Sequence, residues 1–232
     1  MNVQAPIASP AETRISALHR SLAQVWIDFE SALVTVPAIA RLESGRLRIE
    51  DYLQLLFNLR QQVIDGSRWI ARAASHIEPG HDELRSIFTR HAVAEHRDFR
   101  LLEDNYVAAG GDRAAIQGGR QNIGSAALSG WMFTAASRPN PFGLLGAMFV
   151  IEGLGQRVAA RWAKLVQRQL GLGDDAVSFL AYHGANDEDH MAAFDEALAM
   201  VVTDDAIAQS VVSHAKITAR LYRLQLEELD NV

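Results

Sequence analysis

Residues 182–190 read YHGANDEDH and hold two histidines and an aspartate at spacings that suit one face of a helix. His183, Asp187 and His190 occupy positions i, i+4 and i+7, which fall within about 60° of one another on an α-helix. Two imidazoles and a carboxylate on one stripe form a ligand set suited to iron, manganese or zinc. The stretch therefore predicts a helix that carries part of a metal site.

The composition limits the other classes of protein and site. The chain has 232 residues and no cysteine, which excludes disulfides, iron–sulfur clusters and thiolate nucleophiles, so a transition metal needs N and O ligands. A net charge of −6 without a basic cluster argues against nucleic-acid binding. Because there is neither a signal-peptide pattern nor an apolar run long enough to span a membrane, we expect a soluble cytoplasmic protein.

Helical signals cover most of the chain. Residues 9–12 (SPAE) combine an N-cap, a proline at the first helical position and the glutamate of a capping box, and they predict a helix that ends near Leu33. Further helices are expected after Glu50, from His81 to Gly110, around Trp131, from Phe142 to about Leu170, around Phe179 to His183, and after Asp204. With no alternating strand pattern, repeat or long linker, we predict one all-α domain of about seven or eight helices.

Two residues suggest that the helix is interrupted inside residues 182–190. Gly184 is a weak helix former, and Asn186 follows it by two positions, so we expect a break or kink here. In an alternative interpretation, Asn186 is a helix N-cap and the acids at 187–189 are first-turn residues that a helix N-terminus favours.

Glu152 is the next most informative residue, because it lies within an apolar run at residues 148–154. Burying an unpaired carboxylate costs several kcal/mol or forces it to stay protonated. We therefore expect a cationic partner, which is either a metal ion or an arginine such as Arg157 or Arg161.

The helix expected from His81 to Gly110 offers further groups that suit a metal. His91, Glu95 and Asp98 share one face, which is most simply a solvated face. His96 points about 100° away from Glu95. A histidine of this kind, taken alone, is more often an ordinary surface or core residue than a ligand.

In chain order, His96, Glu152, His183, Asp187 and His190 resemble the heme-oxygenase-like diiron oxidases and oxygenases, also described as iron-containing redox enzymes. The wider fold group includes heme oxygenase, thiaminase II (TenA) and pyrroloquinoline quinone synthase (PqqC). The likeness spans roughly residues 80–200. It implies a heme-oxygenase-like helical bundle over the whole chain, in which these five residues hold the metal.

The same resemblance implies the activity. It predicts a non-heme iron enzyme with one or two iron ions per chain, or manganese instead, that acts with O2 as an oxidase or oxygenase on a small organic substrate. An external electron donor is then required, because no flavin or nicotinamide fingerprint is present. The many apolar helical faces are compatible with a homodimer but do not fix it.

One position departs from the family pattern. The family has a glutamate ligand seven residues before the first histidine, and Thr89 stands at that position here. Glu103, seven residues after His96 on the same stripe, is a candidate substitute. The departure leaves open a bundle that has lost its metal site and acts as a non-enzymatic binding or interaction module.

A heme protein is the other alternative. Residues 149–155 (FVIEGLG) resemble the glycine-bearing distal helix of bacterial heme oxygenases, and His19 is a candidate proximal ligand. A heme oxygenase has no use for the histidines and aspartate of residues 182–190, so we rank heme binding below the iron enzyme.

Overall fold

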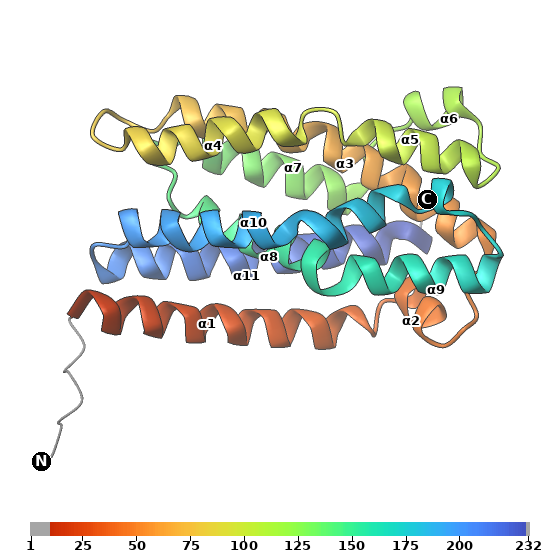
Figure 1. The fold of residues 1–232 in the computed structure, drawn as a ribbon, viewed down its shortest axis with the longest axis horizontal. Helices are drawn as coiled ribbons and strands as arrows, with labels where there is room; N and C mark the ends of the chain where they lie inside the picture. Colours follow the sequence, from red (N-terminus) through yellow and green to blue (C-terminus); the bar gives the residue numbers. More distant parts are fainter. Residues whose placement is uncertain (1–9, 231–232) are drawn as a thin grey trace, which may run out of the picture.

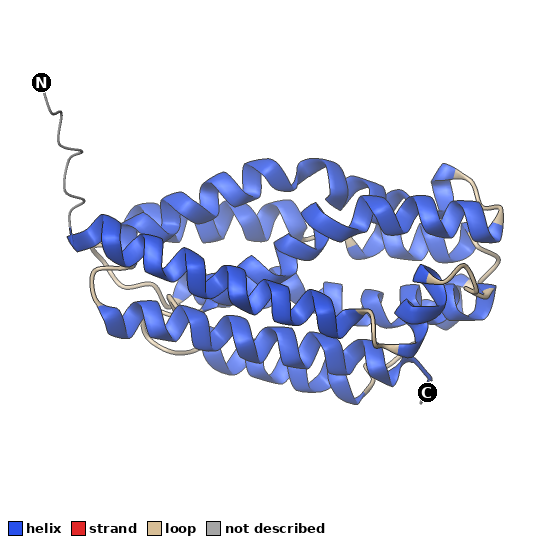
Figure 2. Cartoon of the chain, turned by 90° about the horizontal axis from the view of Figure 1, so that it is seen from below, coloured by secondary structure: helices blue, strands red, loops and turns tan. Residues whose placement is uncertain are grey.

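The computed structural model of the protein describes residues 10–230, without the side chains of residues 186–192. Within these residues all regular structure is helical, and the long helices run side by side along the longest axis of the molecule (Figure 1). Figure 2 shows the same helices joined by loops. This arrangement confirms the predicted all-α class.

The described residues form eleven α-helices. They are α1 (Pro10–Leu33), α2 (Pro37–Glu43), α3 (Ile49–Ser75), α4 (Asp82–Glu95), α5 (Phe99–Ala108), α6 (Arg113–Gln117), α7 (Ile123–Ala136), α8 (Leu144–Leu154), α9 (Ala160–Leu170), α10 (Ser178–Val201) and α11 (Asp205–Glu227). Helix α8 lies in the middle of the bundle, in contact with α1, α10 and α11.

Helix α1 begins and ends where the sequence predicts, at Pro10 and Leu33. Its buried face comes from apolar residues at helical spacing, including Leu18, Leu22 and Phe29. This face packs mainly on α11 (Figure 1). Of the described helices, none is individually long and apolar enough to cross a membrane, and only α1 and α2 taken together, with an 83° bend between them, meet that criterion by length and composition.

Two predicted rods are divided, and the short helices α2 and α6 are not predicted, which together explain why there are more helices than the seven or eight expected. The rod from His81 to Gly110 is interrupted by a turn at residues 96–98, between α4 and α5. The rod from Phe142 to Leu170 contains a π-helical segment at Gly155–Ala159, between α8 and α9. Such π segments are frequent at functional sites.

A break at Gly184 is not found, because α10 is one continuous helix from Ser178 to Val201, and a kink at this position stays a prediction. The alternative, in which residues 187–189 form a first helical turn, is wrong for the same reason. Gly184 instead permits close packing, since a Cβ at this position would lie only 2.7 Å from Cβ of Ala160. The glycine therefore brings α10 against the start of α9.

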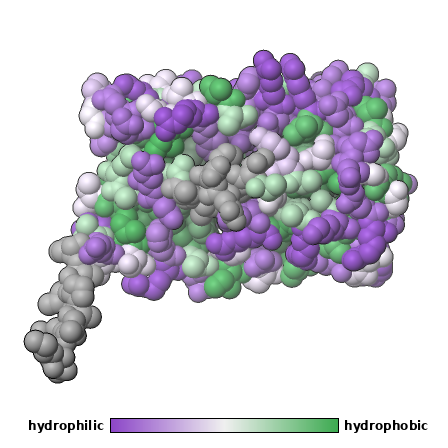
Figure 3. Space-filling model, viewed as in Figure 1, coloured by the Kyte–Doolittle hydropathy of each residue, from purple (hydrophilic) through white to green (hydrophobic). Residues whose placement is uncertain are grey.

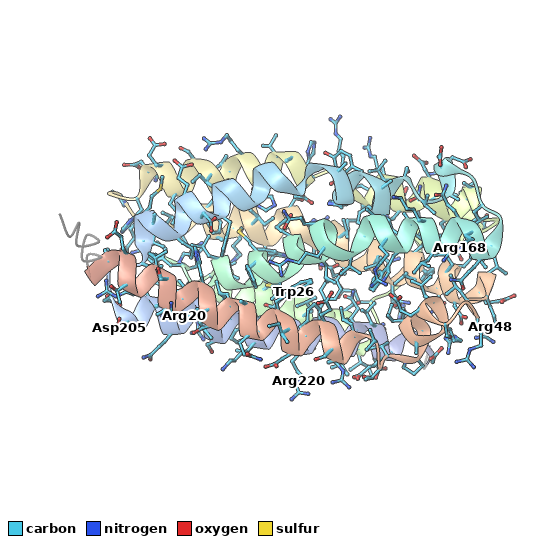
Figure 4. All side chains as sticks on the ribbon, turned by 60° about the horizontal axis from the view of Figure 1, so that its bottom comes forward. Arg20, Trp26, Arg48, Arg168, Asp205 and Arg220 are labelled. Atoms are coloured by element: carbon cyan, nitrogen blue, oxygen red, sulfur yellow. The ribbon has the colours of Figure 1, made fainter. Side chains whose placement is uncertain are left out.

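The face of the molecule seen in the view of Figure 1 is mostly polar. In Figure 3 hydrophilic residues cover much of the visible face, with hydrophobic residues scattered between them. In Figure 4 the labelled Arg48 and Arg220 point away from the bundle, whereas the labelled Trp26 lies between α1 and the helices behind it. Trp26 is buried, and Arg157 from the π-helical segment stacks over its ring at 4.8 Å.

Candidate metal centre

Three groups that suit a metal meet where α4 ends. Glu95 is the last residue of α4, Asp98 lies in the turn that follows, and His183 extends from α10. Each offers one ligand atom, and these three atoms all lie within 4.8 Å of one another. All three side chains are at most 16% exposed. The turn at residues 96–98 thus places a second carboxylate beside Glu95 and opposite His183.

A second pair lies one helical turn earlier. Nε2 of His91 on α4 is 3.1 Å from Oε1 of Glu152 on α8 and 3.8 Å from Oε1 of Glu95. Glu152 is buried between apolar neighbours on α8. We call the five residues His91, Glu95, Asp98, Glu152 and His183 the acid–histidine cluster. It joins α4, α8 and α10 in the interior of the bundle.

Two atoms of the cluster are poorly satisfied. Oδ2 of Asp98 and Nε2 of His183 are buried and lie 3.4 Å apart, a long contact whose geometry falls short of a good hydrogen bond. Leaving a buried polar atom without a hydrogen bond costs about 1–3 kcal/mol, and more for a charged group. A cation bound between the two atoms would offset this cost.

Burial and neighbouring charges change the acidity of the cluster. Burial raises the pKa of Glu95 to about 7, with a further contribution from repulsion by Glu152 and a partial offset from His183 and His91. Burial alone would lower the pKa of His183, but Asp98, Glu95 and Glu152 outweigh it, so this pKa is raised. Three carboxylates therefore attract positive charge to one buried place. The carboxylate oxygens and the imidazole nitrogens of the cluster are donors that suit iron or manganese.

The structure does not bring His96 into the acid–histidine cluster. Its side chain is exposed, its Nδ1 lies 2.6 Å from the carbonyl oxygen of Val93, and it lines a surface groove with Thr89. This geometry does not support His96 as a ligand of the cluster, and its assignment as a ligand stays a prediction.

The solvated face that the sequence predicts for His91, Glu95 and Asp98 is wrong, because their side chains are only 13%, 16% and 10% exposed. Leu84 and Phe88 are fully buried and set the inward side of α4. His91 and Glu95 follow these two residues by seven positions each, so they lie on the same inward stripe. This spacing from the apolar anchors was the signal in the sequence that could have identified them.

Thr89 and Glu103, the two residues in the predicted departure from the family pattern, lie elsewhere. Thr89 lies on the outward side of α4 and donates its hydroxyl to the carbonyl oxygen of Arg85. Glu103 accepts hydrogen bonds from the guanidinium of Arg60 at 2.8 and 3.0 Å and from Gln117 at 2.8 Å. Glu103 is therefore half of a buried ion pair and not a substitute ligand. Thr89 lies outside the acid–histidine cluster, so its presence does not indicate that the metal site is lost.

The two arginines expected as partners of Glu152 are engaged elsewhere. Arg157 stacks over Trp26, and Arg161 forms an ion pair with Glu43. Glu152 faces His91 instead, and this imidazole can bind a metal beside the carboxylate. The side chains of Asp187 and His190 lie outside the described residues, so their role as ligands stays a prediction.

The residues proposed for heme binding do not form a heme site. His19 is exposed on α1, and its Nε2 lies 3.3 Å from Oδ1 of Asp195. Trp26 covers Gly153, where a Cβ would lie 2.8 Å from the indole ring. The space above the glycine-bearing helix is thus filled by a side chain of this protein.

A cavity of about 100 Å³ adjoins the acid–histidine cluster. His91, Glu95, Glu152 and His183 form its polar end. The other walls are mostly apolar and come from α3, α8, the start of α9, α10 and α11. A small molecule in this cavity would lie directly against the carboxylates and imidazoles.

Comparisons with known proteins agree with this fold. A crystal structure from Shewanella denitrificans, described as a domain of unknown function with a heme oxygenase-like fold, superimposes with a TM-score of 0.85 at 18% identity, covering 94% of this chain and 92% of that one. A TenA homolog from Pseudomonas syringae pv. tomato gives 0.75 at 14% identity, with 98% and 99% covered. At such identities these similarities show the fold alone.

Heme oxygenase-1 from the cyanobacterium Synechocystis, solved in complex with heme, gives a TM-score of 0.71 at 14% identity and covers 94% of this chain and 92% of its own. A comparison with curated protein sequences finds no match. Residues 88–223, more than half of the chain, match the family described as iron-containing redox enzyme. The protein therefore belongs to the family of iron-containing redox enzymes with a heme-oxygenase-like fold.

Proposed function

We propose that this protein is a non-heme iron oxidase or oxygenase that acts with O2 on a small organic substrate. The observation that carries the proposal is the buried acid–histidine cluster, in which Glu95, Asp98 and His183 offer three ligand atoms within 4.8 Å. Family membership supports iron as the metal. The adjoining cavity supports a small substrate.

The residues of the cluster would hold the metal as follows. Glu95, Asp98 and His183 form one set of ligands, and the His91–Glu152 pair supplies a second set one turn along α4. Asp187 and His190, which share the helical stripe of His183 by their spacing, would complete the coordination. If both sets of donors bind, the site is compatible with two iron ions. If only one set binds, it is compatible with one iron ion.

Bound ferrous iron supplies the capacity to react with O2. The protein supplies a water-poor place for the substrate beside the ligands, because Met148, Ile151 and Leu180 line the cavity next to them. Glu95 keeps a proton up to a pH of about 7 in the metal-free chain, so binding a metal through its carboxylate releases that proton. Electrons come from an external donor in this proposal.

The test is anaerobic loading of the purified chain with ferrous iron, followed by desalting and an iron count. We expect one to two iron ions per wild-type chain, a clear loss in His183→Ala, and O2 uptake with ascorbate that follows the iron content. His19→Ala is the matched control, because it removes an exposed histidine and should retain iron. A wild-type chain that retains no iron, or equal retention in His183→Ala, would contradict the proposal.

A further inference from the structure

The cavity beside the acid–histidine cluster has features that the metal does not explain. Helix α3 forms one wall of this cavity with Gln62 and Gly66, which lie one helical turn apart. Trp69 of α3 is part of the same wall, and Trp162 of α9 also lines the cavity. These residues determine what the cavity can hold, so they bear on the substrate of the function proposed above.

Gln62 is a buried amide that faces the cavity. Its residue surface is only 8% exposed, and no described residue forms a hydrogen bond with its side chain. The adjacent Gln61 differs, because its amide binds Arg60 and the carbonyl oxygen of Ile116. Gln62 therefore has one donor group and one acceptor group available for a molecule in the cavity.

Gly66 leaves space in the same wall. It lies in the middle of α3, where a glycine destabilises the helix by about 1 kcal/mol relative to alanine. No close packing requires it, since a Cβ at this position would have no atom within 4 Å. Its φ is also ordinary for a helix. The missing side chain at Gly66 keeps part of the cavity open.

In the metal-free chain, the charges around the cavity disfavour an anion. Its described lining contains no arginine or lysine, and its charged groups are the carboxylates and imidazoles of the cluster. A ligand carboxylate would be buried next to Glu95 and Glu152, and only the imidazoles of His91 and His183 could offset the repulsion. The remaining lining is apolar apart from Gln62, the two tryptophans and Tyr222.

We propose that this cavity binds a neutral, mainly apolar molecule with one hydrogen-bonding group, which pairs with the amide of Gln62 in the space left by Gly66. The proposal rests on the function proposed above and specifies its substrate class. The volume of the cavity, about 100 Å³, is of the same order as the volume of about 150 Å³ of an apolar cavity that binds benzene. A single substituted ring or a short branched chain is therefore the appropriate size.

The experiment uses three probes of equal ring size, benzamide, toluene and benzoate, titrated by calorimetry into the full-length, metal-free chain. Fluorescence of Trp69 and Trp162, which line the cavity, gives a second readout. We expect benzamide and toluene to bind and benzoate not to bind. Failure of both neutral probes, or benzoate binding at least as tightly as benzamide, would overturn the proposal.

Two variants test the residues. Gln62→Leu should weaken benzamide roughly tenfold and change toluene by about twofold at most, because the leucine removes only the hydrogen bonds. Unchanged benzamide affinity would overturn the role of Gln62. Gly66→Leu should abolish binding of both neutral probes, and retained binding would overturn the role of Gly66. Gly130→Leu is the matched control, because Gly130 is also a helical glycine with open space around it, but it is exposed on α7, away from the cavity.

Iron retention separates this proposal from the function on which it rests. Gly66→Leu should retain as much iron as the wild type, because Gly66 offers no ligand atom. If the wild type binds benzamide but no iron, the oxidase proposal fails and the assignment of the cavity stands. If it retains iron but binds neither neutral probe, the assignment of the cavity fails and the metal centre stands.

Discussion

Nε2 of His91 on α4 lies 3.1 Å from Oε1 of Glu152 on α8, and this contact joins two helices that are far apart in the sequence. The carboxylate that the sequence places in an apolar run thus faces an imidazole and not an arginine. An imidazole can serve as a metal ligand beside the carboxylate, whereas a guanidinium cannot. The contact therefore places two groups that can bind a metal side by side.

The role of Glu103 can be tested by stability. Glu103→Ala should lower the free energy of unfolding by about 3–5 kcal/mol, because it leaves Arg60 buried without its partner. Iron retention should not change. Denaturant unfolding measures the loss of stability. Asp104→Ala is the control, because Asp104 pairs with Arg113 at the surface and its loss should lower the free energy of unfolding by at most about 1 kcal/mol. A stable Glu103→Ala variant that loses iron would make Glu103 a ligand after all.

Asp51 should make the stability depend on pH. Hydrogen bonds from Arg48 and Arg41 outweigh the opposing effect of burial and lower the pKa of Asp51 from 3.8 to about 2. Because the folded pKa is the lower one, the stabilisation is complete above the unfolded pKa and is lost as the pH falls from about 4 through 2.

The variant Asp51→Asn isolates this contribution. It should lower the free energy of unfolding by about 2 kcal/mol at pH 6. This figure is the lowering of the Asp51 pKa converted into free energy. The difference from the wild type should shrink toward zero at pH 2. Urea unfolding of both chains at a series of pH values measures this difference in the free energy of unfolding. A difference that stays constant from pH 6 to pH 2 would show that the carboxylate charge of Asp51 does not stabilise the fold.

The crossing of α8 and α11 depends on Gly146. A Cβ at this position would lie 1.9 Å from the carbonyl oxygen of Val211, so Gly146→Ala should separate the two helices and lower the free energy of unfolding by about 1–3 kcal/mol. Gly130→Ala is the control, because its Cβ meets nothing and should raise helix stability by up to about 1 kcal/mol. Thermal unfolding compares the two, and equal effects would contradict close packing at Gly146.

The parts of the fold that the sequence predicts are those with local signals. Pro10 and Leu33 bound α1 as expected, and Asp204 caps α11 by accepting a hydrogen bond from the backbone N–H of Ile207. The π-helical segment at Gly155–Ala159 and the turn at residues 96–98 have no comparable local signal. They depend on how distant helices pack, so the sequence predicts two long rods there.

The candidate site was predicted in part for a similar reason. Glu152 and His183 were identified from their own surroundings, an apolar run and a helical spacing of ligands. His96 was chosen by its interval from Glu152, although the apolar anchors Leu84 and Phe88 place His91 on the inward side instead. The phase of a helix is set by its buried residues, and an interval between distant residues does not define it.

The central claim is that the inward stripe of α4 holds the metal, and one pair of variants tests it most directly. We would load His91→Ala and His96→Ala with ferrous iron anaerobically and count the iron retained per chain. We predict that His96→Ala matches the wild type, because its histidine is exposed, and that His91→Ala loses iron while it stays folded. Full iron in His91→Ala together with loss in His96→Ala would contradict the claim.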